Sequence, residues 1–533
     1  MEFARGKLMV ASFLTLVAAG IGFATRTAAL PAWESEFNIT GVQFGGILGA
    51  GFLGFGAMIF FGGILVEWFG YKTLLAVAFV LHLISAAMFF MATPTFEAAM
   101  TDDPANATAK VVQLLWLSTV LFSVCQGLYE AVINPLVADL YPESKTHYLN
   151  ILHAGWPAGM IIGGLFAAAF MGNTPWVTAI PWQWAMSAYV AVVLIYGVLA
   201  LPEKMPATAS AAAADSSGVA GSFACFASIP FLVLLGLHGC IGYMELGVDS
   251  WMASLMESLL PNAILVLVYT SFLMFILRFF AGPIVHRINP IGLLFASSII
   301  SCLGLLWLGQ PTTSLVMVFA AATFYSFGKA FLWPTMLGVA GERYPRSGAI
   351  AMGAMGAVGM LTVGLVAGGR IGAQQGEGFS VALQEAAPET FERYADAETT
   401  SSWGYDYRSV SGAKSAAAKA IEVGEDGSIS GTEPIAEANQ IAEEEKAALI
   451  ANAATDVPAV QAANLAGGRT ALIKTAAIPG IMVVGFLGLL IYYRSIGGYK
   501  PVEMEKAEPR AEDTDQPVGD VAAEKEENLA ATT

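Results

Sequence analysis

The stretch Gly63-Ile-Leu-Val-Glu67-Trp-Phe-Gly70-Tyr-Lys72 lies where one long apolar segment, residues 42–66, gives way to the next, residues 73–92. Its glycines allow two helices to approach closely and to turn within a few residues. Glu67 and Lys72 carry opposite charges and could pair beside this turn. The stretch therefore predicts a tight helical hairpin with a polar tip.

The whole chain is apolar, since 56% of its 533 residues are hydrophobic and only 13% are charged. Soluble domains usually contain about 25% charged residues. Apolar stretches of about 20 residues can cross a bilayer, and they must be helical because lipid offers the backbone no hydrogen-bond partners. We expect an all-α integral membrane protein, with the lipid bilayer as a partner. Twelve helices are predicted near residues 8–30, 42–66, 73–92, 111–137, 150–171, 183–201, 228–251, 262–285, 288–308, 315–340, 348–370 and 475–493.

An even number of helices places both termini on one side of the membrane. The Lys and Arg residues of the short connections fall on that side, apart from Lys110. Such an excess marks the cytoplasmic side. We expect a multi-pass protein of the cell (inner or plasma) membrane with both termini cytoplasmic. The residues on this side are Arg5, Lys7, Lys72, Lys145, Lys204, Arg287, Arg343 and Arg346.

An Ala-, Ser- and Gly-rich stretch, residues 203–227, has the composition of a flexible linker and is predicted to be cytoplasmic. It separates an N-terminal six-helix half, residues 1–202, from a second half. The second half has helices 7–11 in residues 228–372 and helix 12 in residues 473–494. Two six-helix halves around a central site are a common layout of transporters.

Most of the net charge of −17 lies in two polar appendages. An extracytoplasmic insert, residues 373–472, has 16 acidic and 6 basic residues, and a cytoplasmic tail, residues 495–533, has 10 and 4. The insert is expected to form short helices, for example over residues 434–451, without a packed core. The tail is expected to be disordered. The acidity therefore says nothing about a transported species, and no basic surface suggests nucleic acid.

Motifs for other chemistry are missing. The sequence has no GxxxxGK[ST] loop for ATP and no nucleophile elbow. Its four cysteines, Cys125, Cys225, Cys240 and Cys302, form no CxxC or Cys/His cluster. We expect no enzyme activity, no cofactor and no metal.

The turn quoted above resembles the signature loop of the major facilitator superfamily, G-x-x-x-D-R-x-G-x-[RK]. Gly63, Gly70 and Lys72 match, Glu67 stands for the usual Asp, and Trp68 replaces the first base. The resemblance implies the fold of that superfamily, with twelve helices in two halves, and a latch at the cytoplasmic mouth. The alternative is a tight polar turn in which Lys72 only follows the charge rule.

A weaker copy of the motif, Arg278-Phe-Phe-Ala-Gly282-Pro-Ile-Val-His286-Arg287, occurs six helices later. Copies at equivalent positions are expected of a duplicated six-helix unit. The two copies together imply a cytoplasmic gate made by Gly63, Glu67, Gly70, Lys72, Arg278, Gly282 and Arg287.

Two branches of the superfamily are similar around the charged residues. Gly127-Leu-Tyr-Glu130-Ala-Val-Ile-Asn134-Pro135 resembles the fucose–proton symporters, whose helix-4 glutamate carries the proton. Arg26-Thr-Ala-Ala-Leu-Pro31 lacks the helix-1 aspartate of that branch. It is similar to the anion:cation symporters of sugar acids, in which a helix-1 arginine binds the substrate carboxylate. Thr25 stands where that branch usually has an acid.

Glu130 and Arg26 are also notable without the resemblance. A charged side chain at a bilayer centre costs about 2.5 kcal/mol or more and is usually kept for function. Glu130 is therefore a candidate proton carrier, or else half of a structural ion pair. The planar guanidinium of Arg26 suits a carboxylate or vicinal hydroxyls. Alternatively, it snorkels from the outer end of helix 1.

Candidates in the second half follow a spacing of four residues, which places each pair on one helix face. Glu245 and Asp249 could bind a cation together, or could be solvated acids near an interfacial Trp251. Lys329 could pair with Glu245, and Trp333 could stack on a sugar ring. Packing is the alternative for both. Pro334 is expected to break their helix.

His153 could relay protons or be structural. With Trp156 and Asn134 it completes a predicted substrate site that includes Arg26, Glu245, Asp249, Lys329 and Trp333. We expect a monomeric secondary transporter that couples a proton, or alternatively sodium, to symport of a sugar or sugar acid by alternating access. The alternatives are an organic-anion or drug/proton antiporter and a non-transporting membrane sensor.

Overall fold

The computed structural model describes most of the chain. The described residues are 3–37, 39, 41–171, 180–208, 218–256, 264–312, 314–423, 429–430, 441 and 443–502. Residues 503–533 of the predicted tail and part of the predicted linker, residues 209–217, lie outside them. The first residues of the predicted tail are described, and Tyr499 donates a hydrogen bond to Glu342 at 2.7 Å.

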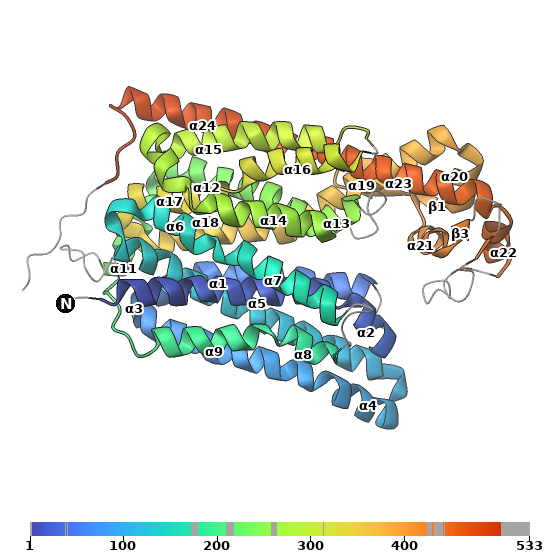
Figure 1. Ribbon diagram of the computed structural model, residues 1–533, viewed down its shortest axis with the longest axis horizontal. Coiled ribbons are helices and arrows are strands. Elements are labelled where there is room, and N and C mark those ends of the chain that lie inside the picture. Colours follow the sequence, from blue (N-terminus) through green and yellow to red (C-terminus); the bar gives the residue numbers. More distant parts are fainter. Residues whose placement is uncertain are drawn as a thin grey trace, which may run out of the picture.

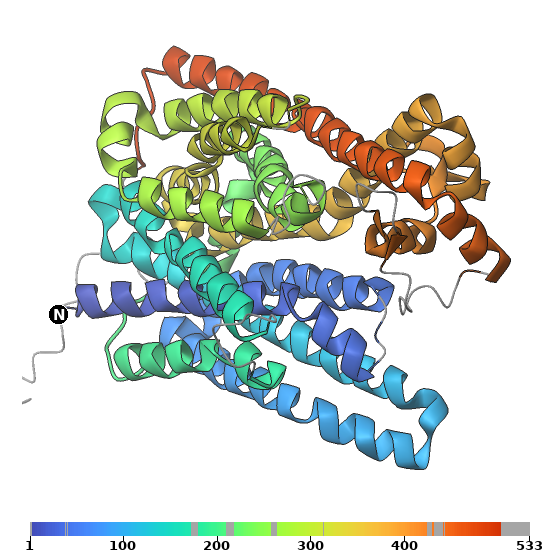
Figure 2. The same ribbon diagram turned by 45° about the vertical axis from the view of Figure 1, so that its right-hand side comes forward.

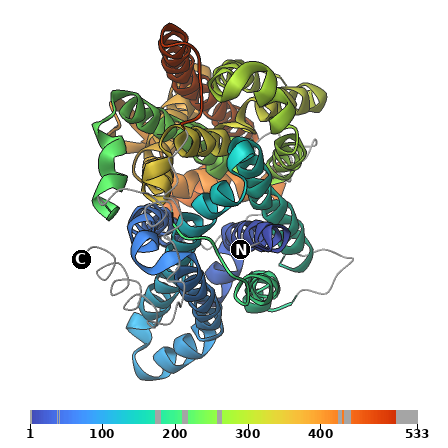
Figure 3. The ribbon, with the colours of Figure 1, turned by 90° about the vertical axis from the view of Figure 1, so that its left-hand side faces the viewer.

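The helices form two bodies that lie side by side, with their axes along the long direction of the molecule (Figures 1 and 3). The first body, here the first half, contains α1 (Arg5–Thr27), α2 (Leu30–Phe37), α3 (Gly41–Phe90), α4 (Ala92–Asp102), α5 (Ala107–Leu140), α6 (Lys145–His153), α7 (Gly155–Phe170), α8 (Trp182–Met186) and α9 (Tyr189–Ala200). We call the end of the bundle at which α1 begins the N-terminal end.

The second body, here the second half, follows two short helical segments, α11 (Gly218–Ser222) and η3 (Phe223–Ala227). Two of its helices contain a π-helical turn, η4 or η6. Its elements are α12 (Ile229–Gly242), η4 (Tyr243–Gly247), α13 (Val248–Met256), α14 (Ile264–Arg278), α15 (Ala281–Leu308), α16 (Leu315–Lys329), α17 (Leu332–Arg343), α18 (Gly348–Thr362), η6 (Val363–Ala367), α19 (Gly368–Ala386), α23 (Ala453–Thr475) and α24 (Ala477–Ser495).

Helix α3 bends back on itself at Gly70. Its neighbours α2 and α4 both lie at the end opposite to the N-terminal end, whereas its middle lies at the N-terminal end (Figure 1). Gly70 has φ 74°, a left-handed conformation that suits glycine. A second turn of this kind occurs in α15, at Asn289 with φ 56°, directly before Pro290. The structure therefore has the predicted helical hairpin and a counterpart in the second half.

Ten helices among the described residues are long and apolar enough to cross a membrane, and residues 266–278 of α14 form a shorter apolar helix. Two of these ten contain the turns at Gly70 and Asn289, so one continuous helix does not equal one crossing. The prediction of an all-α membrane region is confirmed. The count of twelve crossings stays a prediction.

The two halves pack most tightly where α3 meets α18. A Cβ atom added at Gly353 would lie 2.7 Å from the carbonyl oxygen of Ile59, and one added at Gly63 would lie 2.7 Å from that of Ala349. Small residues allow this close approach, which is the usual way in which membrane helices associate. Gly63 therefore belongs to the contact between the halves.

The insert is folded, so the expectation that it lacks a packed core was wrong. Its elements are α20 (Pro388–Tyr394), β1 (Ala395–Ser402), β2 (Tyr405–Val410), α21 (Gly412–Ala420), β3 (Glu422–Val423), β4 (Ile429–Ser430) and α22 (Glu443–Ala451). Strands β1 and β2 pair in an antiparallel hairpin, and so do β3 and β4. These small sheets are an addition to the all-α membrane region. A helix was expected over residues 434–451, and α22 forms its C-terminal part. Residues 434–440 and 442 lie outside the described residues.

The core of the insert forms because two membrane helices continue beyond the bundle. Helices α19 and α23 pack against each other there, and α23 runs on into α24 as one long rod (Figure 2). Phe379, Leu383 and Phe391 are buried between them and α20. The fully buried Asp456 accepts hydrogen bonds from Arg393 and Thr390. The low average apolarity of the insert hid these few well-placed residues.

We predict that Gly353→Ala destabilises the protein by about 1–3 kcal/mol, because the added methyl group meets backbone that cannot move aside. The measurement is thermal unfolding in detergent. Gly236→Ala in α12 is the matched control, since a Cβ atom there has no neighbour within 4 Å. Equal melting temperatures for the two variants would contradict the tight contact between α3 and α18.

Candidate functional site

A cavity of about 90 Å³ lies between the halves and contains Arg26. We call it the Arg26 chamber. Apart from Arg26, its wall is neutral, with aromatic, aliphatic and a few small polar side chains. The lining residues are Phe23, Arg26, Thr27, Leu48, Gly51, Phe52, Phe55, Thr119, Phe122, Ser123, Gln126, Trp156, Leu246, Ser250 and Met360.

Arg26 is buried in this wall, with 2% of its surface exposed, and does not snorkel. Its guanidinium carbon lies 3.4 Å from the centre of the Phe122 ring. Nη1 donates to the carbonyl of Gly22 at 2.8 Å, and Nη2 lies 3.5 Å from the Ser85 hydroxyl. No carboxylate among the described residues forms an ion pair with it. The arginine is held by an aromatic face and by neutral groups.

A second, smaller cavity of about 20 Å³ contains Glu130, and we call it the Glu130 chamber. Trp156, Leu246 and Met360 line both chambers and so form the layer between them. The lining residues are Glu130, His153, Trp156, Glu245, Leu246, Arg278, Trp333 and Met360.

Glu130 is 3% exposed and forms no ion pair among the described residues. The Asn134 amide lies one helical turn further along α5, and its Nδ2 is 3.5 Å from Glu130 Oε2. Asn134 Oδ1 lies 2.9 Å from His153 Nε2. The predicted residues Glu130, Asn134 and His153 thus form a short polar row that runs from α5 to α6.

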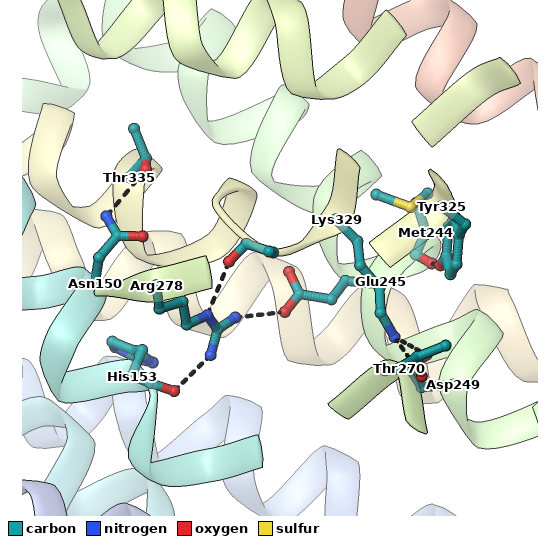
Figure 4. A network of polar contacts seen from close by, with 11 residues as sticks. Asn150, His153, Met244, Glu245, Asp249, Thr270, Arg278, Tyr325, Lys329 and Thr335 are labelled. Atoms are coloured by element: carbon teal, nitrogen blue, oxygen red, sulfur yellow. Dashed lines mark hydrogen bonds and ion pairs between the residues drawn. The ribbon is translucent and has the colours of Figure 1, made fainter. Parts of the chain in front are cut away.

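Arg278 connects three elements at the centre of the bundle (Figure 4). Nη2 pairs with Glu245 Oε1 at 2.9 Å, Nε donates to the carbonyl of Ala330 at 2.8 Å, and Nη1 donates to the carbonyl of His153 at 2.5 Å. Arg278 does not lie beside the turn residues with which the sequence grouped it, and its part in a gate stays a prediction. Arg278 ends α14 inside the bundle, whereas the turn comes only at Asn289.

Lys329 pairs with Asp249 at 2.5 Å (Figure 4). The expected pair of Lys329 with Glu245 is not formed. Glu245 and Asp249 lie about one helical turn apart along η4 and α13, so each acid meets a different neighbouring helix. Glu245 pairs with Arg278 at the end of α14, and Asp249 pairs with Lys329 at the end of α16.

Lys329 and Trp333 are likewise separated, because α16 ends at Lys329 and α17 begins at Leu332. The helix breaks just before the predicted position, and Arg278 binds the freed carbonyl of Ala330. Trp333 lines the Glu130 chamber and packs against His238 at 4.5 Å between ring centres. Lys329 and Asp249 line neither chamber.

Towards the N-terminal end, α6 and α17 close the gap between the halves, as their neighbouring positions in Figure 1 show. Gly282 N also donates to His147 Nδ1 across the halves at 3.1 Å. The bonds between α6 and α17 are Lys145 Nζ to the Gly341 carbonyl at 2.9 Å, Thr146 Oγ1 to Glu342 Oε1 at 2.6 Å, and Asn150 Nδ2 to Thr335 Oγ1 at 3.1 Å.

Other predicted gate residues are dispersed. Gly63 packs against α18, Gly70 makes the turn, and Lys72 and Arg287 are exposed. Glu67 is half-buried.

Sequence reasoning missed several polar contacts. Tyr71 donates to Asp139 at 2.8 Å beside the Gly70 turn. The hydrogen bond between Thr146 and Glu342 in the α6–α17 contact was also not predicted from the sequence. The acids at 139 and 342 follow long apolar runs, which is a usable signal, but nothing in the sequence indicates their partners.

Residues 12–367 match the sequence-family model of the Major Facilitator Superfamily. The chain belongs to this superfamily. It is therefore a multi-pass membrane protein with a transporter fold and not an enzyme. No curated protein matches the chain.

Solved structures confirm the superfamily fold at low identity. FucP of E. coli, in the outward conformation, is 20% identical with a TM-score of 0.54, over 69% of this chain and 91% of FucP. The proton:xylose symporter XylE is 14% identical with a TM-score of 0.56, over 68% and 87%. The human organic anion transporter MFSD10 (TETRAN) is 12% identical with a TM-score of 0.54, over 91% and 100%.

We predict that Arg278→Met destabilises this superfamily member by about 3–5 kcal/mol, because it leaves Glu245 buried without its partner. The double variant Arg278→Met with Glu245→Met should recover most of that loss. The measurement is thermal unfolding in detergent, with Glu245→Met alone completing the cycle. Additive losses in the double variant would show that the pair does not couple the two positions.

Proposed function

We propose that this member of the superfamily is a secondary transporter that couples proton movement to symport of a small organic anion, such as a sugar acid. In this proposal the protein lies in a cell membrane, and the N-terminal end of the bundle faces the cytoplasm. The observation that carries the proposal is Glu130, a buried carboxyl group on a chamber wall without an ion-pair partner in the described chain.

Glu130 is suited to carry a proton because its neighbours stabilise neither form strongly. Burial away from water disfavours the carboxylate. No cation lies within ion-pair distance among the described residues, and the single hydrogen bond from Asn134 is long. The row from Glu130 through Asn134 to His153 orients these side chains towards the gap between the halves, and His153 is its second group that can take up a proton. A group whose charge is left uncompensated can change protonation without first breaking an ion pair.

The Arg26 chamber supports an anion over a neutral sugar. Its one charged lining residue is a cation, and described carboxylates do not neutralise it. A buried cation of this kind is most stable when a ligand supplies the counter-charge. The printed names of the structural relatives include both sugar symporters, FucP and XylE, and an organic anion transporter, MFSD10. A sugar acid combines the two ligand classes.

Alternating access requires the contacts at the N-terminal end to break. In the described conformation, hydrogen bonds join α6 and α17 there, so this end is closed. Opening it must also break the bond from Arg278 to the carbonyl of His153. Arg278 and Glu130 line the same chamber, so a Glu130 carboxylate would compete with Glu245 for Arg278. Release of the proton from Glu130 would therefore weaken the contacts of Arg278 and favour opening between α6 and α17.

The proposed gate motion can be tested by cross-linking Thr146→Cys to Gly338→Cys after the four native cysteines are replaced by alanine. A Cβ atom at Gly338 would lie 2.9 Å from Thr146 Cβ, so a shift of about 1 Å gives disulfide geometry. We predict that oxidation abolishes uptake and that a reductant restores it. Thr146→Cys alone is the control. Full uptake by the cross-linked protein would refute opening between α6 and α17.

Replacing Glu130 by Gln should abolish accumulation driven by a pH gradient while retaining exchange of substrate across the membrane. The amide keeps the shape of the side chain but cannot release a proton. The measurement is uptake into proteoliposomes, with neutral hexoses, uronic acids and aldonic acids as substrates.

Glu203→Gln is the control for this variant, because Glu203 pairs with the exposed Lys7 in the described structure and surface pairs contribute little. Loss of both accumulation and exchange in a normally folded Glu130→Gln protein would refute the coupling role. A sodium gradient that drives wild-type uptake in place of protons would make sodium the coupling ion. Substrate efflux driven by inward protons would instead identify an antiporter.

A further inference from the structure

Three hydrogen-bonding atoms in the wall of the Arg26 chamber have no partner in the described structure. They are Arg26 Nε, Thr119 Oγ1 and Gln126 Nε2. All three residues are at least nine-tenths buried, with exposed fractions of 2%, 3% and 3%. Buried polar atoms are almost always hydrogen-bonded, and each unsatisfied one costs about 1–3 kcal/mol. Each of the three can donate a hydrogen bond, and all three line one cavity.

The three donors lie along one short stretch of wall. Thr119, Phe122 and Gln126 follow each other at spacings of three and four residues, which places them on one face of α5. Arg26 stacks on Phe122, the middle residue of this row. Gly22 allows α1 to come this close, since a Cβ atom there would lie 2.3 Å from the Phe122 ring and 2.8 Å from Arg26 Nη1. Thr119 and Gln126 therefore lie about one helical turn to either side of Phe122, the ring that the guanidinium covers.

Other parts of the chamber wall differ in character. Phe23 lies between Phe52 and Trp156, at 6.0 and 5.6 Å between ring centres, and forms an aromatic surface with them. Two polar residues of the wall already have partners: Ser250 donates to the carbonyl of Leu246 at 2.6 Å, and Thr27 donates within α1. The chamber thus has one donor-rich wall with a positive charge and a large apolar surface.

We infer that the substrate is a monocarboxylate with an apolar or aromatic body, held at its carboxylate by Arg26, Gln126 and Thr119. This inference rests on the proposed function and narrows its substrate class. A carboxylate accepts several hydrogen bonds and neutralises the arginine. The aromatic surface formed by Phe23, Phe52 and Trp156 covers the body. Among small organic anions this disfavours the sugar acid given above as an example, because aromatic rings offer few hydrogen-bond partners to its several hydroxyl groups.

The test is equilibrium binding to the purified full-length protein in detergent, without a membrane gradient, so that it does not depend on proton coupling. The probes are 3-phenylpropionate, its neutral amide 3-phenylpropanamide, and gluconate. We expect 3-phenylpropionate to bind at least ~10-fold more tightly than either of the others, because a hydrogen bond to a charged group is worth more than a neutral one. Equal binding of the amide, tighter binding of gluconate, or no binding of 3-phenylpropionate would overturn the inference.

Variants locate the site. Thr119→Val and Gln126→Leu should each weaken 3-phenylpropionate binding by ~5-fold or more, and Arg26→Met should weaken it further. Thr362→Val is the matched control, because its hydroxyl donates within α18 to the carbonyl of Val358 and lies outside the chamber. Unchanged binding in Thr119→Val and Gln126→Leu would overturn the inference. If Arg26→Met does not fold, the comparison of the three probes on the wild-type protein still decides.

Failure of this inference and failure of the proposed function give different results. If 3-phenylpropionate binds as expected but no ion gradient drives its uptake, the site is retained and proton-coupled transport is refuted. If gluconate binds best and is accumulated with protons, the proposed function holds and the apolar substrate class is refuted.

Discussion

The interior of this protein is organised by the cost of burying charge in an apolar bundle. Two ion pairs in the second half meet that cost internally, Arg278 with Glu245 and Lys329 with Asp249. An ion that lacks a partner in such surroundings is strongly destabilising. Against this background, the two buried ions of the first half, Arg26 and Glu130, stand out, because neither forms an ion pair in the described structure.

The two halves therefore differ in the role of their buried charges, which are structural in the second half and open to ligands in the first. The two ion pairs of the second half are each neutral overall, and they hold α12–α13, α14 and α16–α17 together. The first half has Arg26 in the wall of one chamber and Glu130 in the wall of the other, with Trp156 in the layer between them. A transporter that carries an anion together with a proton needs these two properties. Both ligands would complete the charge balance that the protein leaves open, which makes binding and conformation depend on each other.

Arg278 connects this electrostatic arrangement to the mechanics of the fold. It binds its acid in one half, the broken helix at Ala330, and a carbonyl of the other half at His153. The contact between α6 and α17 lies beyond it towards the N-terminal end. The insert is attached to the same second half through α19 and α23, which continue membrane helices directly. A movement of the second half would therefore carry the insert with it.

The sequence by itself determined the membrane class, the hairpin at Gly70, its counterpart in the second half and the superfamily. These follow from local properties, since hydrophobic length and a left-handed turn do not depend on distant residues. It also indicated Arg26 and Glu130, because a charge within an apolar run is visible without a structure. The partners of Glu245 and Lys329 were decided only by the tertiary structure, since the positions of α14 and α16 beside the two acids determine which base each acid meets.

The same holds for the donor row of Thr119 and Gln126 and for the core of the insert. Neutral polar residues on an apolar helix give no signal until a cavity forms beside them. The core around Leu383 exists only because α19 and α23, far apart in sequence, extend side by side. Local chemistry therefore specified which charges matter, and long-range packing specified what each of them faces, because burial and pairing depend on neighbours that the chain brings together only on folding.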